Sequence, residues 1–263
     1  MSDAVIYEAR GDIGVITLDR PDNRNSMTPE LLDAFAKASY AAKMDTSVRC
    51  VVVTGNGTSF SAGADFKATL QRDDVAGARS PDEKSYAMYE PFLSLLEVEV
   101  PVIGALNGHA VGGGFGLALV CDIRIAAREG KYGANFVALG LAPGMAISHL
   151  LPRLIGVARA SELLFTGRLL GGDEAAHYGI VNRVVPAAQV LPEAMNMARM
   201  IADNAPFAVR ETKRAIYRGL AIQKAQDAAR EEAHYQAMSV ATEDAREGID
   251  ALLAKRKPTF TGR

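Results

Sequence analysis

Short, mainly apolar strand-like runs recur along the first half of the chain, and each leads into a glycine-rich or helix-like segment. Residues 48–54 form a β-branched run that ends at Gly55, and residues 101–106 and 121–127 form two more. Runs that are apolar at most positions, without a regular alternation, are typical of strands buried on both faces. Strands that alternate with helices pair in parallel through helical crossovers. The sequence therefore predicts an α/β fold.

The second half of the chain has a different character. Beyond residue 145 its pattern is helical, with one strand-like run at residues 180–185. We expect helices over residues 146–154, 158–164, 173–178, 190–203, 206–218, 222–239 and 244–255. A soft boundary near Val190 predicts a core over residues 1–190 and a helical C-terminal region over residues 191–263.

Composition narrows the class of protein. Of the 263 residues, 49% are hydrophobic and 23% are charged, and the formal net charge is −2. A disordered chain carries fewer apolar residues, and a protein that binds nucleic acid or an anionic membrane carries a basic field. No run reaches the ~18 apolar residues of a membrane span, and the N-terminus has no apolar signal segment. We expect a cytoplasmic protein.

The cysteines and histidines indicate neither a disulfide nor a metal site. Cys50 and Cys121 each lie in an apolar run, which favours buried free thiols. The four histidines are scattered, and no two of them stand three or four residues apart. That spacing is the one with which a helix places two metal ligands on one face.

Two glycine-rich segments stand between a strand-like run and a helix. Residues 107–116 read NGHAVGGGFG, and residues 59–67 read SFSAGADFK. The first does not fit a dinucleotide-binding fingerprint, and the second does not fit the G-x-S-x-G nucleophile turn. Close helix–strand packing explains the first segment as well as an anion site does. Together, two turns that each offer a backbone N–H indicate an oxyanion hole with two donors.

Seven motifs extend the pattern over nearly the whole chain. They are R-P-x-x-R-N-S (20–26), F-S-A-G-A-D (60–65), N-G-H-A-V-G-G-G (107–114), C-D-I-R-I-A (121–126), G-L-A-P-G (140–144), L-P-R-L-I-G (151–156) and K-R-K-P-x-F (255–260). In this combination the chain resembles the crotonase, or enoyl-CoA hydratase/isomerase, superfamily. The resemblance implies a superhelix of β-β-α repeats with a helical C-terminal trimerisation region. It also implies an acyl-CoA thioester as substrate, no cofactor beyond the coenzyme A of that substrate, and a homo-oligomer, either a trimer or a dimer of trimers.

The resemblance assigns roles to particular positions. It implies that the backbone N–H groups of Ala64 and Gly113 hold the thioester oxygen. The two glutamates with which the family's hydratases activate water and exchange a proton fall at Gly116 and Phe136, and a carboxylate of some isomerase relatives falls at Gly144. These replacements imply that efficient crotonyl-CoA hydration is not the activity of this chain.

For the coenzyme A arm, the resemblance points to residues near the first turn and near the C-terminus: Arg24, Ala62, Asp65, Phe66, Lys67, Lys255 and Lys257. The two C-terminal lysines would reach the adenosine phosphate, in their own or a neighbouring subunit. A solvated surface charge is the alternative for each lysine, and a structural carboxylate at a helix N-terminus is the alternative for Asp65.

Other side chains stand near the expected acyl pocket. The candidates for a replacement acid or base are Asp73, Asp74, Glu83 and Glu90, in or beside a segment that covers this pocket in the resembled family. Tyr86 and Tyr89 line the same pocket or pack elsewhere, and Phe136 and Met145 would make it apolar. His109 stands where the family tolerates several residue types. His149 lies in an apolar helical run and is expected in the core or at an interface.

Three functions remain open at this stage. The first is an acyl-CoA enzyme that works through a thioester enolate, as an isomerase, a lyase such as a decarboxylase, or a hydratase of an unusual acyl chain. The second is a non-catalytic acyl-CoA-binding protein, which the residues at 116 and 136 favour somewhat. The third is a hydrolase of C–C bonds in diketones. Such a hydrolase needs no coenzyme A, so the motifs of the coenzyme A arm argue against it.

Overall fold

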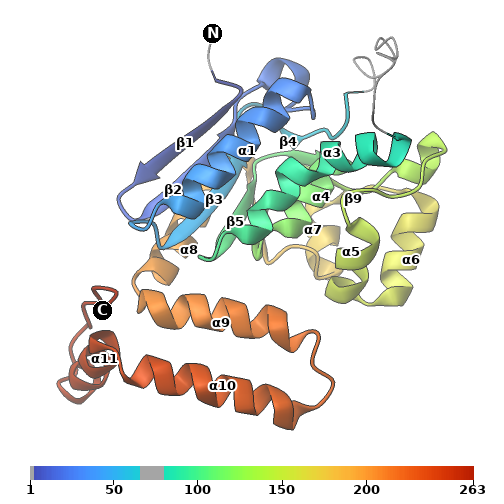
Figure 1. Cartoon of the computed structure of the whole chain (residues 1–263). Coiled ribbons are helices and arrows are strands. Elements are labelled where there is room, and N and C mark those ends of the chain that lie inside the picture. Colours follow the sequence, from blue (N-terminus) through green and yellow to red (C-terminus); the bar gives the residue numbers. More distant parts are fainter. Residues whose placement is uncertain (1–2, 66–79) are drawn as a thin grey trace.

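Two sheets run through the computed structural model, which describes residues 3–65 and 80–263 (Figure 1). The larger sheet has the strand order β1-β2-β3-β5-β7-β10. Its strands are Val5–Arg10 (β1), Ile13–Leu18 (β2), Cys50–Gly55 (β3), Val102–Leu106 (β5), Ile123–Ala127 (β7) and Arg183–Val185 (β10). From β2 to β10 all neighbours pair in parallel, whereas β1 pairs with β2 as an antiparallel hairpin. The parallel α/β fold predicted from the apolar runs is confirmed.

The smaller sheet has the order β4-β6-β8-β9. Its strands are very short: Ser59–Ser61 (β4), His109–Val111 (β6), Lys131–Gly133 (β8) and Leu170–Gly171 (β9). The pairs β3–β4, β5–β6 and β7–β8 each follow one another in the chain and send one strand to each sheet. Because β4, β6 and β8 pair in parallel as β3, β5 and β7 do, the chain winds as the superhelix of strand pairs that the resemblance implied.

Helices alternate with these strands in the first half of the chain and make up most of the second half. They are Pro29–Met44 (α1), Pro81–Leu93 (α3), Gly113–Val120 (α4), Ile147–Ile155 (α5), Val157–Thr166 (α6), Gly172–His177 (α7), Ala187–Ala202 (α8), Pro206–Gly219 (α9), Ala225–Val240 (α10) and Glu243–Leu253 (α11), with 3-10 turns at Pro21–Asn23 (η1), Ser94–Glu97 (η2) and Phe136–Leu139 (η3). All the helices expected after residue 145 form, with ends within a few residues of the predicted ones. No described helix is long and apolar enough to cross a membrane.

One face of the larger sheet is covered by α8. Val190, Ala194, Ala198 and Ala202 recur at every fourth position, so they share one face of this helix, and all are buried. They pack against the strands through Ile13, Val15, Cys50, Val52, Ile103, Ala105, Ile125 and Ala127. The main core lies on the other face. The division near residue 190 stays a prediction. The helix α8 crosses this position and packs against the larger sheet.

The motif at residues 121–126 has a structural role at the end of α4. Arg124 is buried and donates to the carbonyl oxygens of Ala118 (3.4 Å), Cys121 and Ile180 (2.7 Å). A cation that bonds the last carbonyls of a helix also complements its dipole. Burial lowers the pKa of the Arg124 guanidinium.

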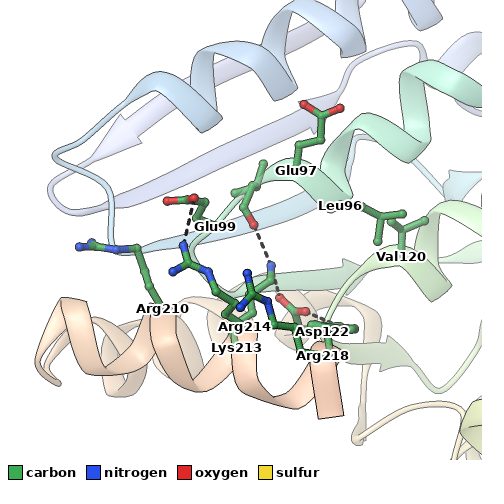
Figure 2. A pocket seen from close by; sticks show the side chains of 11 residues that line it. Leu96, Glu97, Glu99, Val120, Asp122, Arg210, Lys213, Arg214 and Arg218 are labelled. Carbon is green, nitrogen blue, oxygen red and sulfur yellow. Dashed lines mark hydrogen bonds and ion pairs between the residues drawn. The ribbon is translucent and has the colours of Figure 1, made fainter. Parts of the chain in front are cut away.

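The half-buried Lys213 joins the C-terminal helices to the core. Lys213 of α9 donates to the carbonyl oxygens of Val98 and Val100, both at 2.9 Å, and lies 2.8 Å from a carboxylate oxygen of Asp122 (Figure 2). Asp122 also accepts a hydrogen bond from the N–H of Val102 at 2.7 Å. The attachment of α9 therefore rests on a charge that is fully hydrogen bonded.

Both cysteines are free and buried, as expected, and their burial predicts a loss of stability at alkaline pH. Burial raises the pKa of Cys50 and of Cys121 from 9.0 to about 12. The unfolded chain therefore releases these protons first, so the stabilisation is complete below pH ~9 and is lost as the pH rises towards 12. We expect a decline of up to about 1.4 kcal/mol per pH unit for each thiol.

The measurement is the free energy of unfolding in urea at pH 7, 8.5, 9.5 and 10. The matched variant is Cys50→Ala with Cys121→Ala, which should show a shallower decline between pH 8.5 and 10. Equal slopes for the two proteins would contradict the assignment to the thiols.

Candidate functional site

The first turn of the site is held by a buried asparagine. Arg24 and Asn25 both have left-handed backbone, with φ of 59° and 54°, and the side chain of Asn25 is fully buried. It accepts a hydrogen bond from the N–H of Arg20 at 2.8 Å and donates to the carbonyl oxygens of Ser59 at 2.9 Å and Asn56 at 3.1 Å. One side chain thus joins the loop at residues 20–27 to the start of β4.

Backbone hydrogen bonds extend this contact into the turn after β4. The N–H of Ala62 donates to the carbonyl oxygen of Arg24 at 3.0 Å, and the N–H of Met27 donates to that of Gly63 at 2.8 Å. Met27 and Ala64 form an isolated parallel bridge. The turn is therefore fixed on both sides of Gly63, and no described residue accepts a hydrogen bond from the N–H of Ala64.

The second turn, at the start of α4, touches the first directly. Gly63 has a φ of +82°, and a Cβ built on it would lie 2.6 Å from the carbonyl oxygen of Val111 and 2.9 Å from the nitrogen of Gly113. A Cβ on Gly114 would lie 2.2 Å from the carbonyl oxygen of Ser61. Only glycine permits an approach this close.

The N–H groups of Ala64 and Gly113 therefore belong to two turns whose backbones are in direct contact. The N–H of Gly113, like that of Ala64, has no acceptor among the described residues. Gly113 is the first residue of α4, where the helix dipole adds partial positive charge. Such a pair of donors is suited to an oxygen atom that gains negative charge.

Apolar side chains line the next part of the site. A Cβ on Gly116 would lie 2.4 Å from Cβ of Met145, a buried residue with a φ of +56°. The ring of Phe136, which packs against the main core, reaches within 3.8 Å of the place of a Cβ on Gly112. Position 116 thus has no room for a side chain while Met145 keeps its place.

Comparisons with known proteins show the family of this chain. The sequence model of the enoyl-CoA hydratase/isomerase family matches residues 8–263. The chain is 37% identical over 260 residues to crotonyl-CoA hydratase of Syntrophomonas wolfei, with 97% of each chain covered. It is 35% identical over 255 residues to the short-chain-enoyl-CoA hydratase of Clostridium acetobutylicum, with 96% of this chain and 95% of the relative covered.

A solved structure shows the same fold. The crystal structure of an enoyl-CoA hydratase from Bacillus anthracis matches with a TM-score of 0.90 at 33% identity, over 99% of this chain and 100% of the other. The chain belongs to the enoyl-CoA hydratase/isomerase family. The two relatives are named as hydratases of crotonyl-CoA and of short-chain enoyl-CoA. The activity of this chain depends on its own site residues.

Several residues assigned to the coenzyme A arm lie at the first turn of this family member. Ala62 and Asp65 are half-buried there, and Arg24 is exposed beside them. Phe66 and Lys67 lie outside the residues that the structure describes. Lys255 and Lys257 lie beside α11, far from α3 and β4 in the same chain (Figure 1). Within one chain the structure does not bring these lysines to the site, and Lys257 pairs with Asp203 at 2.6 Å.

The candidate acids and bases are placed as follows. Glu83 is the partner of Ser80 in a capping box at the start of α3, and Glu90 is exposed; Asp73 and Asp74 lie outside the described ranges. His109 accepts a hydrogen bond from the N–H of Lys131 at 3.0 Å, which joins β6 to β8.

The expectation that His149 packs in the core is wrong. Its side chain is exposed, and a ring nitrogen lies 2.8 Å from the guanidinium of Arg153. The physical reason is helical periodicity: Ile147 and Leu151, four residues apart, form the buried face of α5, and His149 lies between them on the other side. A place at an interface stays a prediction.

The pocket in Figure 2 is a different place from the pair of N–H groups. It has a volume of about 320 Å³ and lies between η2, the start of β7 and α9. It opens beside Val120, at the opposite end of α4 from Gly113. Among its cations, Lys213 pairs with Asp122 and Arg214 with Glu99. These pairs serve the attachment of α9.

Gly63→Ala tests whether the contact of the two turns is required. The new Cβ would collide with backbone atoms of the second turn, and its residue would keep a left-handed φ. We expect a loss of about 3 kcal/mol of unfolding free energy, together with loss of acyl-CoA binding measured by thermal shift.

Gly11→Ala is the matched control. Gly11 also has a left-handed φ, +68°, but a Cβ there would meet nothing within 4 Å. This variant should lose only about 1 kcal/mol and should keep ligand binding. If Gly63→Ala behaved like Gly11→Ala in both measurements, the close contact would have no functional meaning.

Proposed function

We propose that this chain is an acyl-CoA enzyme that acts through a thioester enolate, with the N–H groups of Ala64 and Gly113 as its oxyanion hole. The observation that carries the proposal is the contact of the two turns, each of which has one N–H group without an acceptor among the described residues. A preorganised donor of this kind contributes about 3–4 kcal/mol to the stabilisation of an oxyanion. The names of the family relatives support an enoyl-CoA or related acyl-CoA substrate.

The ordinary hydratase reaction is not part of the proposal. Water addition needs a base for the water and an acid for the α-carbon, and each is worth about 10²–10⁴-fold. At the positions that the family resemblance assigns to these groups stand Gly116 and Phe136, and the isomerase position is Gly144. We therefore favour an isomerase or lyase reaction over crotonyl-CoA hydration.

A non-catalytic acyl-CoA-binding protein is the second candidate. The apolar contact of Gly116 with Met145, and the ring of Phe136 beside the turn, favour it because neither supplies a proton. The two candidates agree on binding and differ on turnover. A panel of acyl-CoA thioesters, assayed for thermal shift and for product by mass spectrometry, separates them: binding with no product from any thioester would favour the second.

Binding itself tests the shared part of both candidates. We propose that the coenzyme A arm lies along Arg24, Ala62, Asp65, Phe66 and Lys67. Free coenzyme A and acetoacetyl-CoA should raise the melting temperature, because a ligand of the folded state stabilises it by mass action. No shift at millimolar concentration would contradict an acyl-CoA site.

We further propose a homo-oligomer, a trimer or a dimer of trimers, in which Lys255 and Lys257 reach the adenosine phosphate in a neighbouring subunit. Large apolar side chains lie exposed on α6 and α11, among them Phe165 (79% exposed) and Leu252 (77%). Exposed apolar side chains that gather on a surface are typical of association surfaces.

Light scattering tests the assembly. The wild-type chain should have three or six times the 28.0 kDa mass of the monomer, and Phe165→Asp with Leu252→Asp should dissociate it. The matched control is Tyr40→Asp, an exposed site on α1. A wild-type monomer at micromolar concentration would refute the proposal.

Restoring the two glutamates tests the proposed reason for weak hydration. In Gly116→Glu with Phe136→Glu, the new side chain at 116 collides with Cβ of Met145. Adding Met145→Gly removes that atom and suits the left-handed φ at this position. We expect the triple variant to hydrate crotonyl-CoA about a hundredfold faster than the parent.

Met145→Gly alone is the control and should gain no hydratase activity. The assay is the loss of the enoyl absorbance of crotonyl-CoA. Hydration by the unmodified protein at the ~10 s⁻¹ typical of enzymes would overturn the argument and would indicate that another carboxylate has taken over the chemistry.

A further inference from the structure

The side chain of Met27 lies against the second turn of the site, while its backbone pairs with the first. A Cβ built on Gly113 would lie 2.2 Å from Sδ of Met27 and 3.3 Å from its Cε. The sulfur atom therefore occupies the space that a side chain at residue 113 would fill. The N–H of Met27 donates to the carbonyl oxygen of Gly63 at 2.8 Å, and Met27 forms a parallel bridge with Ala64. One residue thus contacts both turns.

The backbone of Met27 is anchored on both sides. Asn25, two residues earlier, is fully buried and its side chain makes three hydrogen bonds to the backbone. Thr28, the next residue, is the N-cap of α1, and its side chain accepts a hydrogen bond from the N–H of Leu31 at 3.3 Å. Met27 itself is 5% exposed and belongs to the main core. Its thioether is therefore enclosed and held in one place against the start of α4.

The second turn has no side chain of its own with which to fix its backbone. Residues 112–114 are all glycine, and glycine backbone has more conformational freedom than that of any other residue. Groups from other segments must therefore define the direction of the N–H of Gly113. At residue 114 the closest group is the carbonyl oxygen of Ser61, from the strand that leads into the first turn. At residue 113 it is the thioether of Met27, an unbranched side chain that fills irregular gaps well.

We infer that Met27 is a positioning residue of the oxyanion hole. Its thioether holds the turn that carries the N–H of Gly113, and its backbone holds the turn that carries the N–H of Ala64. A single residue therefore sets the placement of the two donors relative to each other. The inference rests on the proposed function. Met27 transfers no proton, and its effect is geometric: a misplacement of about 1 Å in a site can cost a hundredfold in rate.

Bound acetoacetyl-CoA reports the placement of the donors directly. Hydrogen bonds to the charged form of a group favour that form, and the enolate of this ligand absorbs at longer wavelengths than its neutral form. The measurement is the pH at which half of the bound ligand is enolate. The wild-type protein should lower this midpoint below that of free acetoacetyl-CoA. Met27→Ala removes the thioether and should raise the midpoint by about one pH unit, which is a tenfold smaller ratio of enolate to neutral ligand at a fixed pH.

Two further variants of the same residue separate the contact from the loss of volume. Met27→Leu keeps a carbon atom as far along the side chain as the sulfur, and its midpoint should match the wild type. Met27→Val ends one atom earlier, and its midpoint should rise as in Met27→Ala. Valine suits a residue in a β-bridge, so this variant also serves if Met27→Ala does not fold.

Met195→Ala is the matched control. Met195 lies on α8, is half-buried and packs on the other face of the larger sheet, so this variant loses the same atoms away from the two turns. Its midpoint should equal that of the wild type. Free coenzyme A should raise the melting temperature equally in every variant, which shows that each is folded and keeps the site of the coenzyme A arm.

The outcomes separate the inference from the function on which it rests. Unchanged midpoints in Met27→Ala and Met27→Val would overturn the inference. It would also be overturned if Met27→Leu or Met195→Ala shifted as far as Met27→Ala, because the contact of the sulfur with Gly113 would then not matter. A wild-type protein that binds acetoacetyl-CoA without lowering its midpoint would instead refute the oxyanion hole itself.

Discussion

The contact between the backbones of Gly63 and Gly113 is the constraint on which the rest of the site depends. Two turns that follow strands of different superhelical repeats meet with no side chain between them. Holding this contact requires that both turns be fixed independently. Asn25 fixes the first through three hydrogen bonds made in a fully buried position, and α4 fixes the second because all its residues are buried.

The superhelix explains why such a contact is available. Each repeat sends a short strand to the smaller sheet, and β4 and β6 pair in parallel, so the turns after them emerge at the same edge. Parallel strands place their carboxyl ends together, and ligands of α/β folds bind there. Asn107 reinforces this edge: it accepts from the N–H of Gly55 at 3.0 Å and donates to the carbonyl oxygen of Gly57 at 3.0 Å. The motif residues Asn25 and Asn107 thus fix the backbone around the site through side-chain hydrogen bonds.

Periodicity and composition made much of this fold predictable. The apolar runs marked β3, β5 and β7, and the spacing of apolar residues marked the C-terminal helices to within a few residues. The strands β4, β6 and β8 are three residues long, too short to show an alternation, and only the family resemblance implied them. The contacts of Tyr89 with Gly144 and of Met145 with Gly116 join distant segments through left-handed or glycine backbone, for which one sequence carries no signal.

The residues at positions 116, 144 and 145 are physically linked to their neighbours by close packing. Met145 can occupy its buried place only because residue 116 has no Cβ, and the phenol of Tyr89 can lie against residue 144 only because that residue has none. A carboxylate at 116 would displace Met145, and one at 144 would displace the phenol. A side chain at residue 116 and the present position of Met145 therefore exclude each other, and so do a side chain at residue 144 and the present position of Tyr89. Because of this exclusion, we expect that a glutamate introduced at residue 116 alone would not create a hydratase site, since Met145 occupies the space that it needs.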